Sequence, residues 1–240
     1  MLEILHRDDQ LIAIHKPAGL LVHRTALDRH ETRFAVQLLR DQIGRHVWPV
    51  HRLDRGTSGV LLFALDTDSL RATAAQFERG TVEKEYRAVV RGWPADSGLI
   101  DHPLPRILDD KDRGHPDALN APQEARTRYQ CLARCELPLP DGRFATSRYA
   151  LLALQPQTGR RHQIRRHLKH IAHPIIGDAT YGKGPHNRAI AGFSGHQRLL
   201  LACTGLRLRH PVSGELLDIG CPLAEDFSAT VLAMSLMPLA

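Results

Sequence analysis

The amino-acid sequence predicts an α+β fold, a mostly antiparallel mixed sheet with flanking helices. Of its 240 residues, 42% are hydrophobic and 24% are charged, which is enough apolar material for a packed core. Short apolar or alternating segments typical of strands are mixed with isolated stretches of helical spacing. The regular strand–helix alternation of a parallel sheet is missing. We therefore expect residues 1–240 to form one domain of this class.

The first half of the chain contains four expected strands and two expected helices. In order, we expect strands at 1–9, 11–15, 59–65 and 82–90, and helices at 34–43 and 69–77. The apolar segment 11–15 is closed by Lys16 and Pro17, and 59–65 is a continuous apolar run typical of a buried strand. Both helices end near a glycine, Gly44 or Gly80.

The second half adds four strands, two helices and two long loops. We expect strands at 125–133, 149–154, 199–207 and 216–219, helices at 159–171 and 224–234, and loops at 103–123 and 177–195. Four prolines among mixed charges predict that 103–123 is an exposed loop. Gly, His and Asn residues predict a loop at 177–195, and loops of this length often carry function.

Positive charge is concentrated in one part of the chain. The 32 Lys and Arg residues exceed the 26 Asp and Glu residues by six. Residues 143–214 contain twelve of these cations and one acid, Asp178, so this stretch carries +11 and the remainder −5. Such a stripe is typical of a surface that binds a phosphate backbone, although an arbitrary charge run is more often a solvated face.

Composition and motifs exclude several classes of protein. The apolar runs are shorter than the ~18 residues that span a bilayer, and the N-terminus lacks the pattern of a signal peptide. Four cysteines without a CxxC pair are typical of reduced thiols in the cytoplasm, where we expect this protein. An aromatic content of 5% argues against an extended base-stacking platform.

No motif indicates a nucleotide cofactor or a metal. A Walker A loop is missing, and Asn187 stands where a dinucleotide fingerprint needs glycine. The acidic loop 109–114 has Lys or Gly at positions where calcium needs oxygen ligands. The histidines between 162 and 173 look like a metal-binding tract, but five cations at residues 160–169 overlap this tract and disfavour a divalent ion. We expect neither a cofactor nor a metal.

The segment 51–59, His-Arg-Leu-Asp-Arg-Gly-Thr-Ser-Gly, contains residues that could form a catalytic site. Asp54 lies between Arg52 and Arg55, and cations on both sides favour a charged carboxylate that can act as a nucleophile. Gly56 and Gly59 allow tight backbone geometry and the close approach of a ligand. Taken alone, these residues fit a surface turn with a salt bridge equally well.

Four motifs in the same order resemble those of the RluA-type pseudouridine synthases, and they cover nearly the whole chain. They are a strand with a Lys-Pro-x-Gly turn, the signature His-Arg-Leu-Asp-x-x-Thr-Ser-Gly, a Lys-x-Tyr-x-Ala-Val strand and Thr-Gly-Arg-x-His-Gln-Ile-Arg, at residues 12–20, 51–59, 83–90 and 158–165. Residues 173–178 and 181–182 complete the pattern. Gly56 replaces the family's proline, and Arg161 replaces its commoner threonine. The resemblance implies the catalytic fold of that family.

The resemblance also implies the isomerisation of uridine to pseudouridine within RNA. The N-glycosidic bond breaks, the uracil turns, and a C–C bond forms to the same sugar, so no cofactor is required. Asp54 corresponds to the family's catalytic aspartate, Tyr86 to its active-site tyrosine, and Arg165 to the arginine that pairs with the aspartate. Attack of Asp54 on the sugar, attack on the base, and assistance to an elimination all stay open.

The expected helix at 159–171 has two different faces. Ile164, Leu168 and Ile171 form an apolar stripe with Arg165 at its edge, while cations occupy the opposite face. The resemblance implies that the target base flips out of its helix, at a cost of a few kcal/mol that contacts with the pocket and with phosphates offset. The residues we expect to bind RNA are His51, Arg52, Arg160, Arg161, His162, Arg166 and Lys169.

A narrower resemblance concerns the substrate. Residues 22–24, 27–34, 39–44 and 186–188 resemble the branch of the family that modifies uridine 65 of tRNA, which implies a tRNA substrate modified in the T-stem. We expect a monomer without a membrane partner and without the small N-terminal RNA-binding module of many relatives. The same chemistry on ribosomal RNA or at another tRNA position stays an alternative. A non-catalytic RNA-binding protein and an Asp54-dependent hydrolase that releases uracil are the alternatives from other classes.

Overall fold

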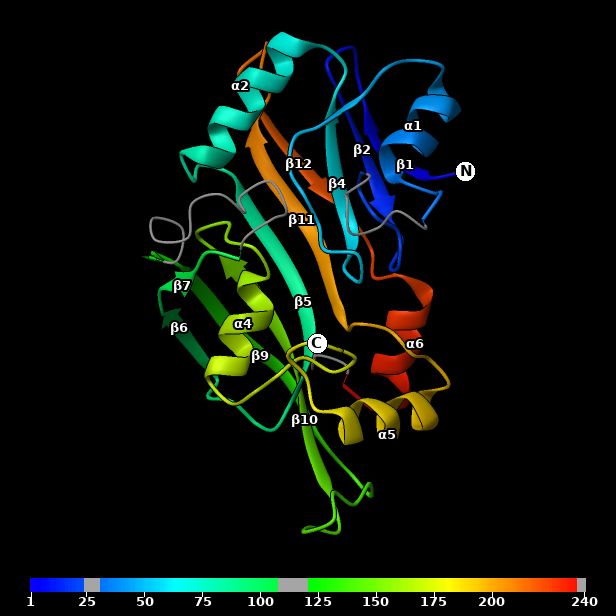
Figure 1. Ribbon diagram of the computed structural model, residues 1–240, viewed down its shortest axis with the longest axis vertical. Coiled ribbons are helices and arrows are strands. Elements are labelled where there is room, and N and C mark those ends of the chain that lie inside the picture. Colours follow the sequence, from blue (N-terminus) through cyan, green and yellow to red (C-terminus); the bar gives the residue numbers. More distant parts are fainter. Residues whose placement is uncertain (24–30, 108–120, 237–240) are drawn as a thin grey trace. The chain divides into compact units, whose positions relative to one another are not determined.

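The computed structural model describes residues 1–23, 31–107 and 121–236, which fall into two compact units (Figure 1). The described residues of the first unit lie within 1–84 and 203–222, together with residue 107. Those of the second unit are 85–106, 121–202 and 223–236. Strands β5 (Glu83–Arg91) and β11 (Leu201–Arg209) contribute residues to both units. The expectation of a single domain stays a prediction.

The first unit contains a sheet in which adjacent strands pair in the order β1-β2-β4-β11, with β3 paired to β4 and β12 to β11. Its other strands are β1 (Glu3–Arg7), β2 (Leu11–Lys16), β3 (Trp48–Pro49), β4 (Ser58–Ala64) and β12 (Leu216–Gly220). The pairs β1–β2, β2–β4, β3–β4 and β11–β12 are antiparallel. All seven residues of β4 are buried, which confirms the predicted buried strand.

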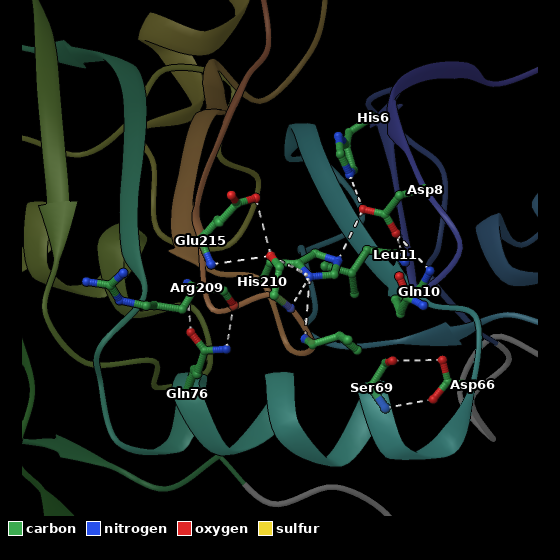
Figure 2. Close-up of polar contacts among 12 residues, drawn as sticks. His6, Asp8, Gln10, Leu11, Asp66, Ser69, Gln76, Arg209, His210 and Glu215 are labelled. Carbon is green, nitrogen blue, oxygen red and sulfur yellow. Dashed lines mark hydrogen bonds and ion pairs between the residues drawn. The ribbon is translucent and has the colours of Figure 1, made fainter.

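The helices of the first unit are α1 (Ala35–Ile43) and α2 (Thr67–Glu78), and both have defined ends. Gly44 ends α1 in the left-handed conformation. Asp66 caps α2 by accepting hydrogen bonds from the N–H groups of Asp68 and Ser69, at 3.0 and 2.8 Å. At the other end, the Gln76 amide exchanges two hydrogen bonds with the backbone of Arg209 (Figure 2). Helix α2 is thereby fixed to the end of β11.

Asp8 joins two turns of the first unit, one between β1 and β2 and one between β11 and β12 (Figure 2). Its Oδ1 accepts hydrogen bonds from the N–H groups of Gln10 and Leu11. Its Oδ2 lies 2.6 Å from Nε2 of His6 and 3.4 Å from Nε2 of His210. These contacts hold the two turns against each other.

The second unit is built on the antiparallel strand order β5-β10-β9-β6. Strands β6, β9 and β10 are Ser97–Asp101, Arg126–Leu137 and Ser147–Pro156, and β7 (Leu104–Pro105) pairs with β8 (Pro122–Gln123). Helices α4, α5 and α6 are Gln163–His170, Gly184–Ser194 and Glu225–Ala233. The α+β class with a mostly antiparallel sheet is therefore confirmed.

Helices cover both faces of this sheet, as the alternation of buried residues along β5 shows. Ala88 belongs to the same apolar cluster as Leu168 of α4. Val89 points to the other cluster, with Ile190 of α5 and Phe227 of α6. Helix α4 therefore packs on one face of the sheet, and α5 and α6 pack on the other.

Two predictions about the second half of the chain were wrong. The helix expected at 159–171 begins at Gln163, because His162 adopts a left-handed backbone with φ 56° and the Gln163 side chain accepts hydrogen bonds from Thr158 and Arg160 in a turn. The loop expected at 177–195 contains helix α5 instead. Pro185 lies in its first turn and Gly195 ends it in the left-handed conformation, and these are recognised start and stop signals.

The remaining strands and helices confirm the predictions to within a few residues. The exceptions are the short strands β3 and β6, which were not predicted, and the ends of the expected loop 103–123, which pair as β7 and β8. Residues 108–120 of that loop lie outside the described residues. So do residues 24–30, which carry part of the narrower resemblance.

Candidate active site

Asp54 lies in a tight turn that leads into strand β4. Its carbonyl oxygen accepts a hydrogen bond from the N–H of Thr57 at 3.0 Å, and the residue is partly buried. The next carbonyl, that of Arg55, accepts a hydrogen bond from the N–H of Gly19 at 2.8 Å. The backbone that carries the carboxylate is therefore fixed both within the turn and from another part of the chain.

A buried lysine connects the Asp54 turn to the end of strand β2. Lys16 is fully buried, and its Nζ donates hydrogen bonds to the carbonyl oxygens of Pro17, Leu20 and Arg55 at 2.9, 2.8 and 3.1 Å. Burial of an ammonium group is costly unless its protons are hydrogen-bonded. Sequence reasoning identified Lys16 only as part of a turn motif and missed this connection.

The residues after the turn are buried, and one of them has to be glycine. Thr57 and Ser58 are almost completely buried. Gly59 has a φ of +111°, and a Cβ atom placed on it would lie 1.9 Å from the carbonyl oxygen of Cys203 in β11. Strands β4 and β11 thus approach each other too closely for any side chain at this position.

His51 precedes the turn and holds strand β4. Its Nε2 accepts a hydrogen bond from the N–H of Leu62 at 3.1 Å, and its ring stacks on Phe77 with centroids 5.0 Å apart. Burial lowers the pKa of His51 to about 3, and the charge of Lys84 acts in the same direction. The ring is therefore neutral at physiological pH, and RNA binding by His51 stays a prediction. Arg52, the next residue, is exposed.

Tyr86 lies on strand β5 in the second unit. It pairs with Leu154 of β10 in the antiparallel register and packs against the apolar cluster beneath α4. The residue is only partly buried. This position suits a ring that is supported from below and can still meet a ligand.

Arg165 is held by an aspartate that sequence reasoning did not select. The Arg165 guanidinium donates two hydrogen bonds to Asp178, from Nε at 2.7 Å and from Nη2 at 2.8 Å. The side chain of Asp178 is 0% exposed and that of Arg165 is 10% exposed. Two parallel bonds fix the plane of the guanidinium, and a guanidinium has five N–H donors, so this pair does not exhaust its capacity.

Three further residues surround this pair. Tyr181 lies with its ring centroid 5.0 Å from Cζ of Arg165, and its hydroxyl forms a 3.0 Å hydrogen bond with Nδ1 of His162. Asn187 of α5 accepts the N–H of Gly177 and donates to the carbonyl oxygen of Asp178. Helix α5 therefore supports the segment that anchors Arg165.

Asp178 is ionised because its hydrogen bonds outweigh its burial. Burial raises the pKa of this carboxyl, but hydrogen bonds from Arg165 and from the N–H groups of Tyr181 and Thr180 lower it further, so that the pKa lies below its ordinary value of 3.8. The stability that Asp178 contributes is therefore present above pH 3.8 and is lost as pH falls through the lower pKa of the folded state.

We expect Asp178→Asn to lower the free energy of unfolding by about 3 kcal/mol at pH 7, because it leaves the Arg165 charge buried without its partner. Urea denaturation measures this loss, and the difference from wild type should shrink as the pH falls below 3.8. Asp96→Asn is the matched control, since Asp96 pairs with Arg134 but its side chain is 87% exposed. Asp96→Asn should lower the free energy of unfolding by less than about 1 kcal/mol. Equal decreases in the two variants would contradict the expectation.

The other predicted RNA-binding residues of the second unit cluster at the beginning and along the polar side of α4. Arg160 donates to the carbonyl oxygen of Glu124 and Arg166 to that of Pro105, both at 2.9 Å. Lys169 is exposed, and Arg161 and His162 are partly exposed. The predicted apolar stripe is buried at Ile164 and Leu168, with Arg165 at its edge, as expected.

The predicted site residues fall in both units. His51, Arg52 and Asp54 belong to the first unit, and the other seven belong to the second. Within the second unit, the structure brings Arg165 and His162 together around Asp178 and Tyr181. The expected pairing of Arg165 with Asp54 stays a prediction.

The histidine tract has structural contacts. The His167 ring nitrogens contact the hydroxyl of Thr127 and the carbonyl oxygen of His102, and His173 contacts the carbonyl oxygen of Arg91. In the described part of the chain, no group of three or more His, Cys, Asp or Glu residues is arranged to hold a metal ion. None of the helices described here has the length and apolar character needed to cross a bilayer.

Comparison with known proteins places this geometry in a family. Residues 10–170, which include Asp54, Tyr86 and Arg165, match the family model described as RNA pseudouridylate synthase. A relative named tRNA pseudouridine synthase C from Haemophilus ducreyi is 52% identical over 226 residues, covering 94% of this chain and 93% of that protein. A relative of the same name from Yersinia pestis is 50% identical over 219 residues, covering 91% and 85%.

A solved structure shows the same fold. The protein described as human RNA pseudouridylate synthase domain containing 4 superposes with a TM-score of 0.73 at 26% identity, covering 99% of this chain and 95% of that one. The fold, together with the family model and the relatives, thus defines an RNA-modifying isomerase. The chain belongs to the RNA pseudouridylate synthase family, in its RluA group, and is an RNA pseudouridine synthase. The predicted family and enzyme class are confirmed.

Proposed function

We propose that this enzyme converts uridine to pseudouridine in tRNA, at uridine 65 of the T-stem, with Asp54 as the catalytic aspartate. The observation that carries the tRNA substrate is the 52% identity, over 94% of the chain, to a relative named tRNA pseudouridine synthase C. The choice of uridine 65 depends on the narrower motif resemblance. The choice of Asp54 depends on its motif and on the turn that fixes its backbone.

The proposed reaction balances without a cofactor. The bond from N1 of uracil to C1′ of the ribose breaks, C5 forms a new bond to C1′, and the hydrogen of C5 leaves while N1 gains a proton. Asp54 is proposed as the group that promotes cleavage, by attack on the sugar or the base or by assisting elimination. Tyr86 is proposed to stack on the uracil and to exchange a proton, and Arg165 to pair with the aspartate.

We further propose that the RNA approaches the cationic side of α4, which carries Arg166 and Lys169. The chain would act as a monomer in the cytoplasm. Phosphate contacts from this side would offset the energy of flipping the target base. The dense positive charge of residues 143–214 supports this placement.

The test is to incubate purified protein with unmodified tRNA and, in a parallel reaction, with unmodified ribosomal RNA, and to map pseudouridine by carbodiimide primer extension and by mass spectrometry. New pseudouridine at position 65 is the expected result. Pseudouridine at another tRNA position, or only in ribosomal RNA, would overturn the proposed site or substrate. Release of free uracil, detected by chromatography, would indicate hydrolysis in place of isomerisation.

We expect Arg166→Glu combined with Lys169→Glu to raise the Kd for tRNA about 10-fold or more. Reversing two charges removes phosphate contacts, so the slope of log Kd against log salt concentration should fall by about 1.5. Fluorescence anisotropy across a salt series measures both quantities. The control is a double reversal in the first unit, Arg71→Glu on α2 with Arg79→Glu at the C-cap of that helix, since both residues lie outside the basic stretch. Equal effects in the two double variants would count against the placement on α4.

A further inference from the structure

A second surface of the second unit has the composition of a nucleic-acid contact, although no predicted site residue lies there. It is the end of the β9–β10 hairpin, residues 138–148, together with the neighbouring Trp93, and we call it the hairpin tip. In Figure 1 the hairpin extends beyond helices α4 and α5 of the same unit. A role in RNA binding would therefore be separate from that of α4.

The hairpin tip exposes two aromatic rings, and each of them lies against an arginine. Phe144 is 60% exposed and Trp93 is 41% exposed. The Arg143 guanidinium lies 5.5 Å from the ring centroid of Phe144, and that of Arg148 lies 4.4 Å from the ring centroid of Trp93. Unpaired bases stack on aromatic rings and guanidinium planes, and phosphates are attracted to the same cations.

Hydrogen bonds hold the tip in one conformation. Oδ1 of Asp141 accepts the N–H groups of Phe144 and Arg143 at 3.1 and 3.3 Å, and Asp141 donates its own N–H to the carbonyl oxygen of Phe144. Ser147 donates its hydroxyl proton to the carbonyl oxygen of Leu139 at 2.6 Å. A turn that is ordered before binding loses little conformational entropy when a ligand arrives.

Asp141, the one acid among residues 138–148, is directed toward the protein, whereas Arg143 is exposed. Oδ2 of Asp141 lies 3.5 Å from Arg91 and 3.9 Å from His186, and its side chain is 17% exposed. The N–H of Phe144, followed by that of Arg143 and the charges of His186 and Arg91, holds the pKa of Asp141 below its ordinary value despite its burial. Arg143 itself is exposed. The tip therefore offers a positive charge beside an aromatic ring.

The position of the tip indicates which RNA segment it could meet. The side chains of Gln163 and His167 of α4 contact Thr127 near the start of β9, and the tip begins after Leu137. Ten residues of strand correspond to about 33 Å at about 3.3 Å each. B-DNA rises about 3.4 Å per base-pair step and an A-form RNA helix rises less, so this length spans at least about ten base-pair steps of RNA. An RNA bound along α4 would reach the tip only with a segment well outside the target stem.

We propose that the hairpin tip is a second RNA contact, on which an unpaired base outside the target stem stacks against Phe144 while Arg143 meets a phosphate. This inference rests on the proposed tRNA substrate. The tip binds a distant part of the tRNA and takes no part in the chemistry. It therefore affects affinity for a complete tRNA and leaves turnover on a short target stem–loop unchanged.

The test compares wild type with Phe144→Ala plus Arg143→Ala on a full-length tRNA transcript and on the isolated T-arm stem–loop. KM and Kd for the full tRNA should rise about 5-fold or more, as for the loss of one stacked base, with kcat unchanged. Both constants for the stem–loop should stay at their wild-type values.

Single substitutions separate the two contributions. Phe144→Tyr should keep the affinity for the full tRNA, and Phe144→Leu should lower it. Arg143→Ala alone should lower the salt slope by about 0.7 to 0.9.

Leu232→Ala on α6 is the control for loss of an exposed apolar side chain, since Leu232 is 66% exposed. Unchanged constants for the full tRNA in the double variant, or equal losses on both RNAs, would overturn the proposal. A change of sedimentation coefficient in the double variant would also overturn it, by assigning the tip to contacts between protein chains. Absence of pseudouridine with wild type would defeat the proposed function alone, because the Kd comparison still tests the tip.

Discussion

Asp54→Asn is expected to abolish pseudouridine formation while leaving the affinity for tRNA within about twofold of wild type. The substitution replaces one carboxylate oxygen by an amide nitrogen and keeps the size of the side chain. The contacts that hold the turn involve the carbonyl oxygens of Asp54 and Arg55, so they survive the change. A neutral amide can neither attack carbon nor accept a proton, and loss of such a group costs about 10²-fold or more in rate.

Single-turnover assays with excess enzyme measure the chemical step, and anisotropy measures the affinity. Asp68→Asn is the matched control, because Asp68 is an exposed aspartate of the same unit. It should leave both quantities unchanged. Substantial turnover by Asp54→Asn in a protein with an unchanged melting temperature would remove Asp54 from its proposed role. Loss of tRNA binding would instead give the carboxylate a structural role.

Gly59→Ala is expected to lower the free energy of unfolding by about 4 kcal/mol or more, a large part of the 5–15 kcal/mol typical of a folded protein. The φ of +111° strains any residue with a Cβ atom, at a cost of about 1–3 kcal/mol. The added methyl group would also lie 1.9 Å from the carbonyl oxygen of Cys203. That neighbour is backbone, so no side-chain rotation relieves the clash and β4 must move away from β11.

Two other glycines separate these effects. Gly44→Ala introduces a positive-φ alanine with open space around it, so it should cost only the backbone strain, about 1 kcal/mol. Gly220→Ala has neither problem and should be close to neutral. Urea denaturation of the three variants ranks them. A Gly59→Ala protein as stable as Gly44→Ala would mean that β4 and β11 tolerate separation.

Local sequence patterns were sufficient for most of the fold, because burial and helix ends leave local signals. The continuous apolar run at 59–65 became β4, and Gly44 ended α1 as its position indicates. The region 177–195 failed because its glycines and polar residues outweighed the signals of Pro185 and Gly195. Buried contacts of His186 and Ile190 stabilise α5, and such contacts are not visible in local spacing.

The candidate catalytic residues could be proposed from sequence motifs, but the residues that hold them in place could not. Asp54, Tyr86 and Arg165 each stand in a recognisable pattern. The partner of Arg165 within its own unit, Asp178, lies thirteen residues further along, beyond the reach of helical periodicity. The neutral state of His51 likewise depends on burial by distant residues. Tertiary packing decides these features, and a single sequence does not display it.

The buried Lys16 has a consequence for how this enzyme can vary. An ammonium has three protons, and the three carbonyl oxygens that receive them belong to Pro17, Leu20 and Arg55. One side chain thereby links the backbone next to Asp54 to a turn that lies almost forty residues earlier in the chain. Substitutions at 17–20 that shift those carbonyl groups would displace Lys16 and with it the backbone next to Asp54. The segments 17–20 and 54–55 therefore share one ammonium group, and the tolerance of either segment to substitution is expected to depend on the other.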